Sequence, residues 1–426
     1  MLKYVCIAIA IIIGEAVAKS TFPVPRLPTS CPSTAVRRDI NTLSPSDQQR
    51  FIKVVREMHR RGWMDGFGSM HDHISHQVHG NEQFFAWHRR FLRHFEMLMQ
   101  EIDPDVVLPY WNWGTHWQNP FADPVLSSAL FGGNGRASDN CVMDGAQARW
   151  GRNYPSKNCL TRKFRYGAST GSFWPMRAVR DVMKTAKTHA QFRTRIENGA
   201  HGIVHLGLGG DFETMWAPVD VLFFLHHAMI DKVWAEWQTH DPLRYQNVDG
   251  HDAAQQPVTA DSAMPFYGED VSSALTTNGP GYCYVYDDVP AAPTVPRHKP
   301  KVMLSLSTNS TAAIRPEPAP PAPTPPQEPD VQGQDGDQDT GNASGDEEEE
   351  AAAEFFVKSH DLDAGEAKIA DFEPPQPMDK SWLKKGFYDI DEAARMQELV
   401  DNVVAQINAE RREGAPALRK KRQRKA

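Results

Sequence analysis

The chain has 426 residues, a net charge of -8 and 40% hydrophobic residues. This length suits one large domain with extensions, or two to three ordinary domains. The net charge averages an acidic run, Asp346 to Glu350, and a basic run, Arg419 to Lys425, which we interpret as solvated tails. The rest of the chain carries no nucleic-acid-binding motif, so we expect no nucleic-acid partner.

The N-terminus has the pattern of a secretory signal peptide. Lys3 precedes an apolar stretch from Val5 to Ile13, and Ala16-Val17-Ala18 forms a small-residue cleavage site. We therefore predict a signal peptide over residues 1–18 and a secreted, extracellular protein, with an uncleaved anchor as the alternative. No later stretch reaches the roughly 18 apolar residues of a membrane span.

Cysteine usage is consistent with an oxidising compartment. Four cysteines remain after the signal peptide, and they allow three disulfide pairings. We favour Cys141 with Cys159, which closes a short loop, and Cys31 with Cys283, which ties the ends of the core together. A thiolate zinc site is not expected, because the sequence has no CxxC pair.

The readable elements up to about residue 290 are helices. Ser44-Pro45-Ser46-Asp47 has the N-cap, proline and acidic residue of a helix start, and apolar residues follow at helical spacing. Further helices are predicted over Gln83 to Glu101, Arg193 to Leu206 and Val221 to Trp237. Residues 114–172 are rich in Gly, Asn and Ser and are expected to be loops, and Tyr282 to Tyr286 to be a short strand. We expect a mainly α fold with a four-helix bundle core and long irregular loops.

The composition changes after the predicted core. Residues 291–375 are rich in Pro, Ala, Gly, Asp and Glu, and we predict a disordered linker there, with glycosylation sequons at Asn309 and Asn342. Apolar residues return at helical spacing from Asp389 to Arg412. Because a lone amphipathic helix is marginal in water, we expect the extension 376–412 to dock on the core. Residues 413–426 form a basic tail.

Three groups of histidines occur in aromatic, helical settings. The first comprises His71, His73, His76, His79 and His88, the second His201 and His205, and the third His226 and His227. His201 and His205 are spaced i, i+4, which places both imidazoles on one helix face, able to share a metal. Any one of these residues alone would be interpreted as a satisfied core histidine.

Imidazole-rich sets suit zinc, copper, iron or nickel, and spacing does not select among them. A ferritin-like di-iron site would need paired Glu-x-x-His motifs, which this chain lacks. The residues by themselves therefore predict two tri-histidine sites within helices, with the metal left open.

Two long motifs resemble those of the tyrosinase and catechol oxidase family of binuclear copper proteins. HGNEQFFAWHRRFLRHFE, from His79 to Glu96, is similar to the first copper signature, and DVLFFLHHAMIDKVW, from Asp220 to Trp234, is similar to the second. Val221 stands where the family usually has proline. PYWNW (109–113), CYVYDD (283–288) and the C-terminal stretch from residue 381 to 408 also resemble family segments. The resemblance covers about 36–290, and we expect the copper domain over 31–290.

The resemblance implies two copper ions and a ligand set. The copper ion of the first site would be bound by His71, His79 and His88, with His73 or His76 as alternatives to His71. Its second site would be held by His201, His205 and His227, while His226 is not expected to be a ligand. Phe223 matches the aromatic residue that packs on the second site.

The resemblance also implies oxidation of phenols or o-diphenols to o-quinones by O2. Glu197 matches the glutamate that holds a proton-accepting water, with a solvated helix residue as its alternative. The asparagine that usually follows the first ligand of the second site is replaced by Gly202. This replacement favours diphenol oxidation over monophenol hydroxylation. The family's C-terminal extension often covers the active site, a role that residues 376–412 could fill.

Two other functions remain open at this stage. A haemocyanin-like O2 carrier would use the same six ligands and exclude phenols, although such carriers are large multi-domain arrays. A non-catalytic secreted matrix protein is the third possibility, against which six intact ligands speak. An enzyme acting on a small phenol with O2 is the function that we predict.

Overall fold

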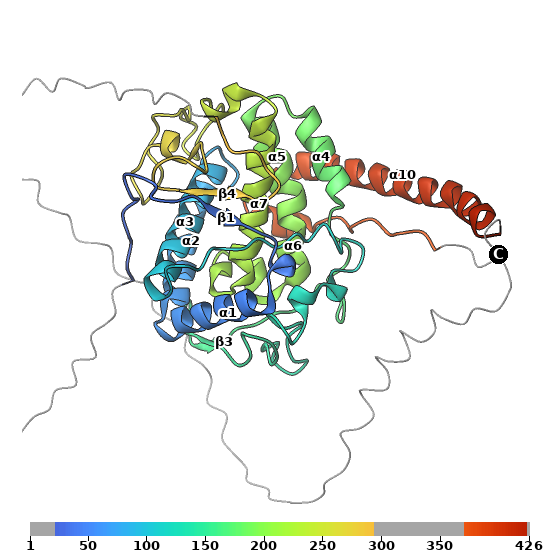
Figure 1. Cartoon of the computed structure of the whole chain (residues 1–426), viewed down its shortest axis with the longest axis horizontal. Coiled ribbons are helices and arrows are strands. Elements are labelled where there is room, and N and C mark those ends of the chain that lie inside the picture. Colours follow the sequence, from blue (N-terminus) through green and yellow to red (C-terminus); the bar gives the residue numbers. More distant parts are fainter. Residues whose placement is uncertain (1–21, 294–369, 424–426) are drawn as a thin grey trace, which may run out of the picture. The chain divides into compact units, whose positions relative to one another are not determined.

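Helices are the main regular elements of the described chain (Figure 1). The computed structural model describes residues 22–293 and 370–423, and all of these belong to one compact unit. The long helices are α1 (Pro45–Arg60), α2 (Trp63–Val78), α3 (Phe84–Ile102), α4 (Met176–Thr185), α5 (His189–Ile196), α6 (Gly202–Leu208), α7 (Leu222–Thr239) and α10 (Ile390–Gln423), with a short α9 (Lys380–Lys385). The predicted mainly α fold is confirmed.

Helix α1 begins as its sequence predicts. The Ser44 hydroxyl accepts a hydrogen bond from the Asp47 backbone N–H, and Pro45 occupies the first turn. Helix α2 was not predicted, because its sequence combines glycine, aspartate and histidine in place of a clear apolar stripe. It starts after Gly62, whose φ of 74° suits glycine, and buries Phe67 and His71.

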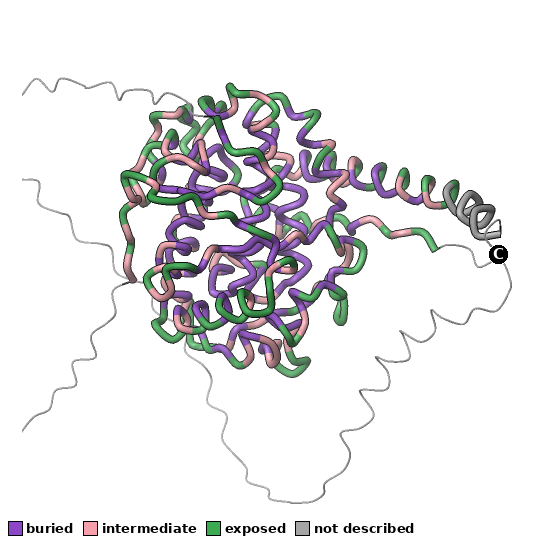
Figure 2. The backbone as a smooth tube through the Cα atoms, in the orientation of Figure 1, coloured by how far each residue is buried: buried purple, intermediate pink, exposed green. Residues whose placement is uncertain are grey.

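Helices α3 and α7 lie side by side at the centre of the core, where nearly every residue of α7 is buried (Figure 2). Arg89 of α3 pairs with Asp231 of α7 over 2.6 Å, and both side chains are almost fully buried. Glu96 of α3 pairs in the same way with Arg37. A buried charge that loses its partner is costly, so these pairs fix the register of α3 against its neighbours.

The predicted helix over Arg193 to Leu206 is longer and is interrupted. Helix α5 is followed by one turn of π-helix, η4 (Glu197–His201), and then by α6. Single π-turns are frequent at functional sites. Short 3-10 turns connect other elements, at Ile40–Thr42, Pro120–Ala122, Pro124–Leu126, Gly210–Glu213, Ala217–Val219, Pro242–Tyr245 and Val271–Ala274.

Residues 114–172 are mostly loop, as predicted. The hairpin β2 (Gly151–Arg152) with β3 (Asn158–Cys159) and the Cys141–Cys159 disulfide stabilise this region. Buried Arg162 joins it to the start of α7 by a bidentate pair with Asp220, at 2.7 and 3.0 Å. The loop therefore positions the helix that carries the third histidine group.

Two strands join the ends of the core. Strand β1 (Ala35–Arg37) pairs in parallel with β4 (Tyr284–Tyr286), which lies within the predicted strand. Cys31 and Cys283 form the second disulfide next to this pair. Both favoured disulfide pairings are confirmed.

Helix α10 packs against η4, α4 and α5 over its residues up to Glu410, which pairs with Arg177 of α4 (Figure 1). Contacts with the core begin before the extension, since the Ser172 hydroxyl donates to the Glu373 carbonyl and Trp117 contacts Phe372. Within the described ranges, every helix is too short or too polar to cross a bilayer. The predicted signal peptide, both sequons, the acidic run and most of the predicted linker lie outside the described residues.

Candidate metal centre

Two clusters of buried histidines lie at the centre of the helices. One contains His71, His79 and His88, and the other His201, His205, His226 and His227. Within each cluster, the potential ligand atoms all lie within 4.8 Å of one another. The structure thus brings together the six histidines that the resemblance implied, and it places His226 beside them.

In the first cluster, His71 comes from α2, His79 ends that helix, and His88 lies in the first turns of α3. The Nε2 atoms of His71 and His88 are 3.3 Å apart. The alternatives His73 and His76 are exposed and lie outside the cluster. The burial difference follows from helix geometry, because the inner face of α2 that carries His71 turns residues 73 and 76 toward solvent.

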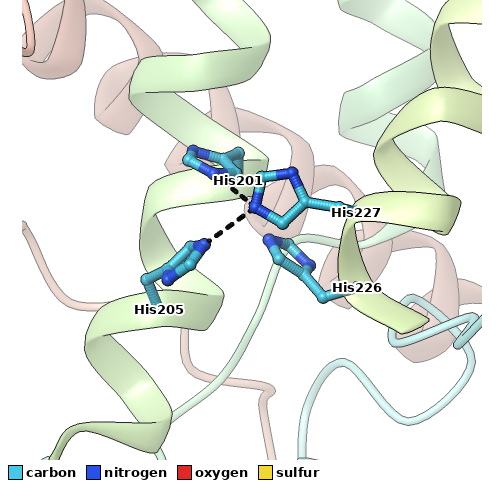
Figure 3. A group of neighbouring side chains, drawn as sticks. All are labelled: His201, His205, His226 and His227. Atoms are coloured by element: carbon cyan, nitrogen blue, oxygen red, sulfur yellow. Dashed lines mark hydrogen bonds between the residues drawn. The ribbon is translucent and has the colours of Figure 1, made fainter. Parts of the chain in front are cut away.

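In the second cluster, His201 and His205 project from neighbouring turns toward His227 of α7 (Figure 3). The Nε2 atom of His227 lies 3.3 Å from the Nε2 atoms of both His201 and His205. His226 is fully buried, and neither of its ring nitrogens has a hydrogen-bond partner among the described residues.

The outward ring nitrogens show which nitrogens are free to bind a metal. Backbone carbonyls lie 2.5–3.3 Å from the Nδ1 atoms of His71, His79, His88, His201 and His205. These Nδ1–H groups donate to the carbonyls, so each Nε2 presents a lone pair to the cluster interior.

The converging lone pairs fit metal ions. Two such lone pairs facing each other at 3.3 Å, as on His71 and His88, repel unless a cation lies between them. A tetrahedral ion bound at about 2.0–2.1 Å from each imidazole would have ligand nitrogens about 3.3–3.4 Å apart. The spacing and the donor set therefore suit one ion in each cluster.

The two clusters adjoin. The rings of His88 and His227 are stacked with centroids 4.6 Å apart. Phe223 stacks on His227 at 4.0 Å and also contacts His71, so it packs against both clusters. Phe84 likewise contacts His88 at 4.6 Å and His201 at 5.0 Å. The sequence places Phe84 on the inner helix face, but its position between the clusters depends on the tertiary fold.

Burial keeps these imidazoles neutral. It lowers the pKa of His79 and of His205 to about 4, because the charged form loses its hydration. Burial, followed by the neighbouring imidazoles, lowers the pKa of the others well below its usual value, namely His71, His88, His201, His226 and His227. Neutral imidazole is the form that binds metal.

Glu197 is fully buried beside the clusters, so its interpretation as a solvated helix residue is wrong. Its Oε1 accepts a hydrogen bond from the Gly80 N–H over 2.8 Å, and its Oε2 accepts one from Arg193 Nη1 over 3.1 Å. Burial raises the pKa of Glu197 to about 7, although Arg193 and the Gly80 N–H act in the opposite direction.

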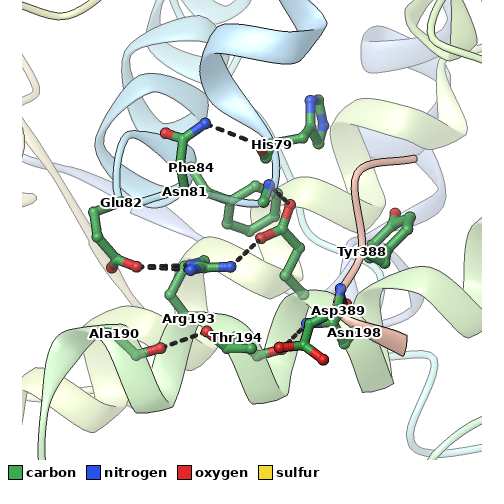
Figure 4. A network of polar contacts seen from close by, with 12 residues as sticks. His79, Asn81, Glu82, Phe84, Ala190, Arg193, Thr194, Asn198, Tyr388 and Asp389 are labelled. Atoms are coloured by element: carbon green, nitrogen blue, oxygen red, sulfur yellow. Dashed lines mark hydrogen bonds and ion pairs between the residues drawn. The ribbon is translucent and has the colours of Figure 1, made fainter. Parts of the chain in front are cut away.

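Arg193 also bonds Glu82 through Nε and Nη2, at 3.0 and 2.8 Å (Figure 4). The second oxygen of Glu82 lies 2.7 Å from His189 Nδ1. Glu82 follows His79 by three residues, so this network joins segments of both clusters. Sequence reasoning missed Arg193, although its i, i+4 spacing to Glu197 is a recognisable ion-pair signal.

Residues of the C-terminal extension lie against the second cluster. The Tyr388 hydroxyl is 3.4 Å from His201 Nδ1. Figure 4 shows the neighbouring contact, in which the Asp389 N–H donates to Asn198 Oδ1 over 2.8 Å. The Trp382 indole N–H donates to the Glu213 carbonyl over 3.2 Å. No local pattern in the sequence indicates which of these residues approach the histidines.

Comparison with known proteins agrees with this geometry. The family model described as the common central domain of tyrosinase matches residues 54–240, which include all seven clustered histidines. A tyrosinase of Streptomyces antibioticus is 34% identical over 239 residues, which cover 49% of this chain and 84% of that protein. A tyrosinase of Aspergillus flavus is 28% identical over 300 residues, covering 63% and 82%.

Among solved structures, a mutant polyphenol oxidase from Thermothelomyces thermophila is similar with a TM-score of 0.52 and 20% identity. The match covers 59% of this chain and 88% of that one. At this identity the likeness shows the shared fold.

Proposed function

Because this chain belongs to the tyrosinase family, we propose that it oxidises o-diphenols to o-quinones with O2 at a pair of copper ions. His71, His79 and His88 would hold one ion. His201, His205 and His227 would hold the other. The observation that carries the proposal is the pair of adjoining clusters with inward-facing imidazole lone pairs. Copper bound there would supply the O2 chemistry and accept the two electrons of the diphenol.

The remaining work falls to the side chains of this chain. Phe84 and Phe223 exclude water from the space between the clusters, since both are fully buried against the imidazoles. We propose that Glu197 accepts a proton from the substrate hydroxyl at one of its carboxylate oxygens. Its pKa of about 7 leaves a substantial fraction ionised near neutral pH and suits it to proton transfer.

We propose that diphenols are preferred over monophenols. Gly202 has no side-chain amide that could share a water with Glu197. The side-chain amides of the nearby Asn198 and Asn81 already bond the backbone. Asn198 bonds the Thr194 carbonyl and the Asp389 N–H, and Asn81 bonds the His79 carbonyl and the Gln83 N–H.

The test is a quinone assay on copper-loaded protein with dopamine and with tyramine, with the extension present and removed. We expect dopamine to be turned over faster. Equal rates would contradict the diphenol preference. Reversible O2 binding without quinone formation would instead support a haemocyanin-like carrier, and a copper content far below two per chain would support a non-catalytic protein.

We further propose that the extension, residues 376–412, covers the site and holds the enzyme latent. Support comes from Tyr388 beside His201, from the indole bond of Trp382, and from the Arg195–Glu392 ion pair at 3.2 Å. Truncation near residue 300 should raise activity. Unchanged activity after truncation would contradict the proposal.

We also propose secretion after cleavage of residues 1–18, with a copper domain over 31–290, a linker over 291–375 and a basic tail from 413. The two disulfides support an oxidising compartment. N-terminal sequencing of secreted protein should begin at Lys19, and retention of the native protein in the cytosol would contradict this proposal.

A further inference from the structure

Two glycines directly follow histidines of the metal centre, one in each cluster. Gly80 follows His79, and Gly202 follows His201. Both face the C-terminal extension of the same chain. A Cβ on Gly80 would lie 2.3 Å from the carbonyl oxygen of Phe387, and a Cβ on Gly202 would lie 3.0 Å from the sulfur of Met378.

We propose that Gly80 and Gly202 form a two-point docking surface for residues 378–388, so that the missing side chains beside the metal centre are what allow the extension to close. This inference rests on the proposed function, because it assigns a structural basis to the proposed latency. It gives Gly202 a role in regulation besides its effect on substrate preference.

At Gly80 the contact is with backbone. The φ of Gly80 is +66°, and the approaching atom is the carbonyl oxygen of Phe387, which no rotamer change can move aside. Phe387 itself has a φ of 64°, a strained conformation for a non-glycine residue. The extension therefore accepts backbone strain at the residue whose carbonyl lies on Gly80. The Gly80 N–H is fixed from the other side by Glu197.

At Gly202 the contact is with side chains. Besides Met378, the indole of Trp382 would lie 3.4 Å from an added Cβ. Trp382 stacks on Tyr388 with centroids 4.9 Å apart, so Met378, Trp382 and Tyr388 form a continuous apolar plug next to His201. A side chain at position 202 would push against this plug.

The docked segment is also fixed at both ends. Arg165 donates to the carbonyls of Gln376 and Pro377, at 3.4 and 2.6 Å. The Asp389 N–H donates to Asn198. With both ends held, the segment cannot shift along the core to accommodate a new side chain, so substitutions at the two glycines should open it.

The experiment measures hydrogen exchange of the amides of residues 378–389 in the full-length, metal-free protein. Gly202→Ala should accelerate this exchange modestly and Gly202→Asn by at least about tenfold, because overpacking at a fixed contact is destabilising. The matched control is Gly151→Ala, where the nearest atom to an added Cβ is 3.8 Å away. Gly202→Ala also serves if the Asn variant fails to fold.

Gly80→Ala needs a control for its positive φ. Gly268 has a φ of +71° with nothing within 4 Å of an added Cβ, so Gly268→Ala reports strain alone. Gly80→Ala should accelerate exchange in residues 378–389 beyond its effect on the rest of the chain, and Gly268→Ala should not.

Met378→Ala provides the direct test of contact, because it removes the atom nearest to an added Cβ. In that background Gly202→Ala should have little further effect on exchange. The proposal is overturned if Gly202→Asn leaves exchange of residues 378–389 unchanged, or if the Gly202→Ala effect is the same with and without Met378.

The readout is independent of copper and of oxidase activity. Altered exchange, combined with no quinone formation after copper loading and removal of the extension, would support the docking surface and count against the proposed function. Unaltered exchange in a protein that oxidises diphenols would support the proposed function and count against the docking surface.

Discussion

Arg193 and Glu197 form a buried ion pair, in which guanidinium Nη1 donates to the carboxylate over 3.1 Å. The same guanidinium bonds Glu82, so a single cation stabilises two buried carboxylates, one from the segment that follows His79 and one from the segment that precedes His201. This arrangement makes Arg193 a positioning residue for Glu197.

Arg193→Met should therefore be strongly destabilising. Removing one partner of a buried pair typically costs about 3–5 kcal/mol, because the remaining charge is left without compensation. Urea denaturation would measure the change in the free energy of unfolding. The matched control is Arg195→Met, two residues away, whose partly exposed pair with Glu392 should be worth no more than about 1 kcal/mol. Equal effects of the two substitutions would contradict the assignment.

The same substitution should move the pH dependence of catechol oxidation. Arg193 lowers the pKa of Glu197 against the larger effect of burial. Without Arg193 that pKa rises, so the acid limb of the activity profile should shift to higher pH, by about one unit or more. Arg193→Lys, which keeps the charge, should shift the limb less. An unchanged limb in the Met variant would exclude Glu197 as the titrating group.

Metal-free protein should lose stability as the pH falls from about 6.5 toward 4. The seven clustered histidines have a folded-state pKa below the unfolded value, so the unfolded chain binds more protons in this window. His79 alone, lowered to about 4, should contribute roughly 3 kcal/mol. The raised pKa of Glu197 has the opposite effect on stability, because there the folded chain binds the extra proton, but this is a single group against seven. Denaturant titrations at several pH values test this, and a flat profile would contradict it.

Copper content should show that His71, and not His73 or His76, is a ligand of the first site. His71→Asn removes a buried imidazole from the first cluster and should reduce bound copper from two ions to about one per chain. His73→Asn and His76→Asn change exposed side chains and should retain both ions. Metal analysis after dialysis gives the answer, and loss of copper in the His73 variant would reverse the assignment.

Phe223→Ala should destabilise the protein by about 3–5 kcal/mol, because Phe223 is fully buried between the clusters and its removal leaves a cavity. We also expect weaker copper retention, since the ring supports His227 at 4.0 Å. Phe266→Ala, at a site 57% exposed, should change stability by about 0.5 kcal/mol or less. Thermal unfolding of both variants gives the comparison.

The sequence predicts those elements whose signals are local. Helix α1 has its cap and proline, and α3 and α7 have long apolar faces, so their existence and approximate bounds could be predicted. Helix α2 could not, because His71 on its buried face points into a metal centre formed by distant segments, which interrupts the apolar stripe. The π-turn at Glu197–His201 likewise has no local signature.

For the site, residue types could be predicted but neighbours could not. His79, His88, His201 and His227 belong to recognisable motifs, whereas the burial of Glu197 depends on Arg193 and Gly80 meeting it from different segments. The glycines at 80 and 202 are conspicuous only once residues 378–388 are seen against them. Such long-range contacts leave no periodicity in the sequence.

The depth of the clusters has a consequence for biosynthesis. The six proposed ligands are only 1–6% exposed. Tyr388 contacts His201, and Trp382 stacks on Tyr388. A hydrated ion cannot reach such atoms through the closed protein. Copper delivery is therefore expected to precede final closure of the chain, which makes the order of metallation and compaction a determinant of how much holoenzyme a cell produces.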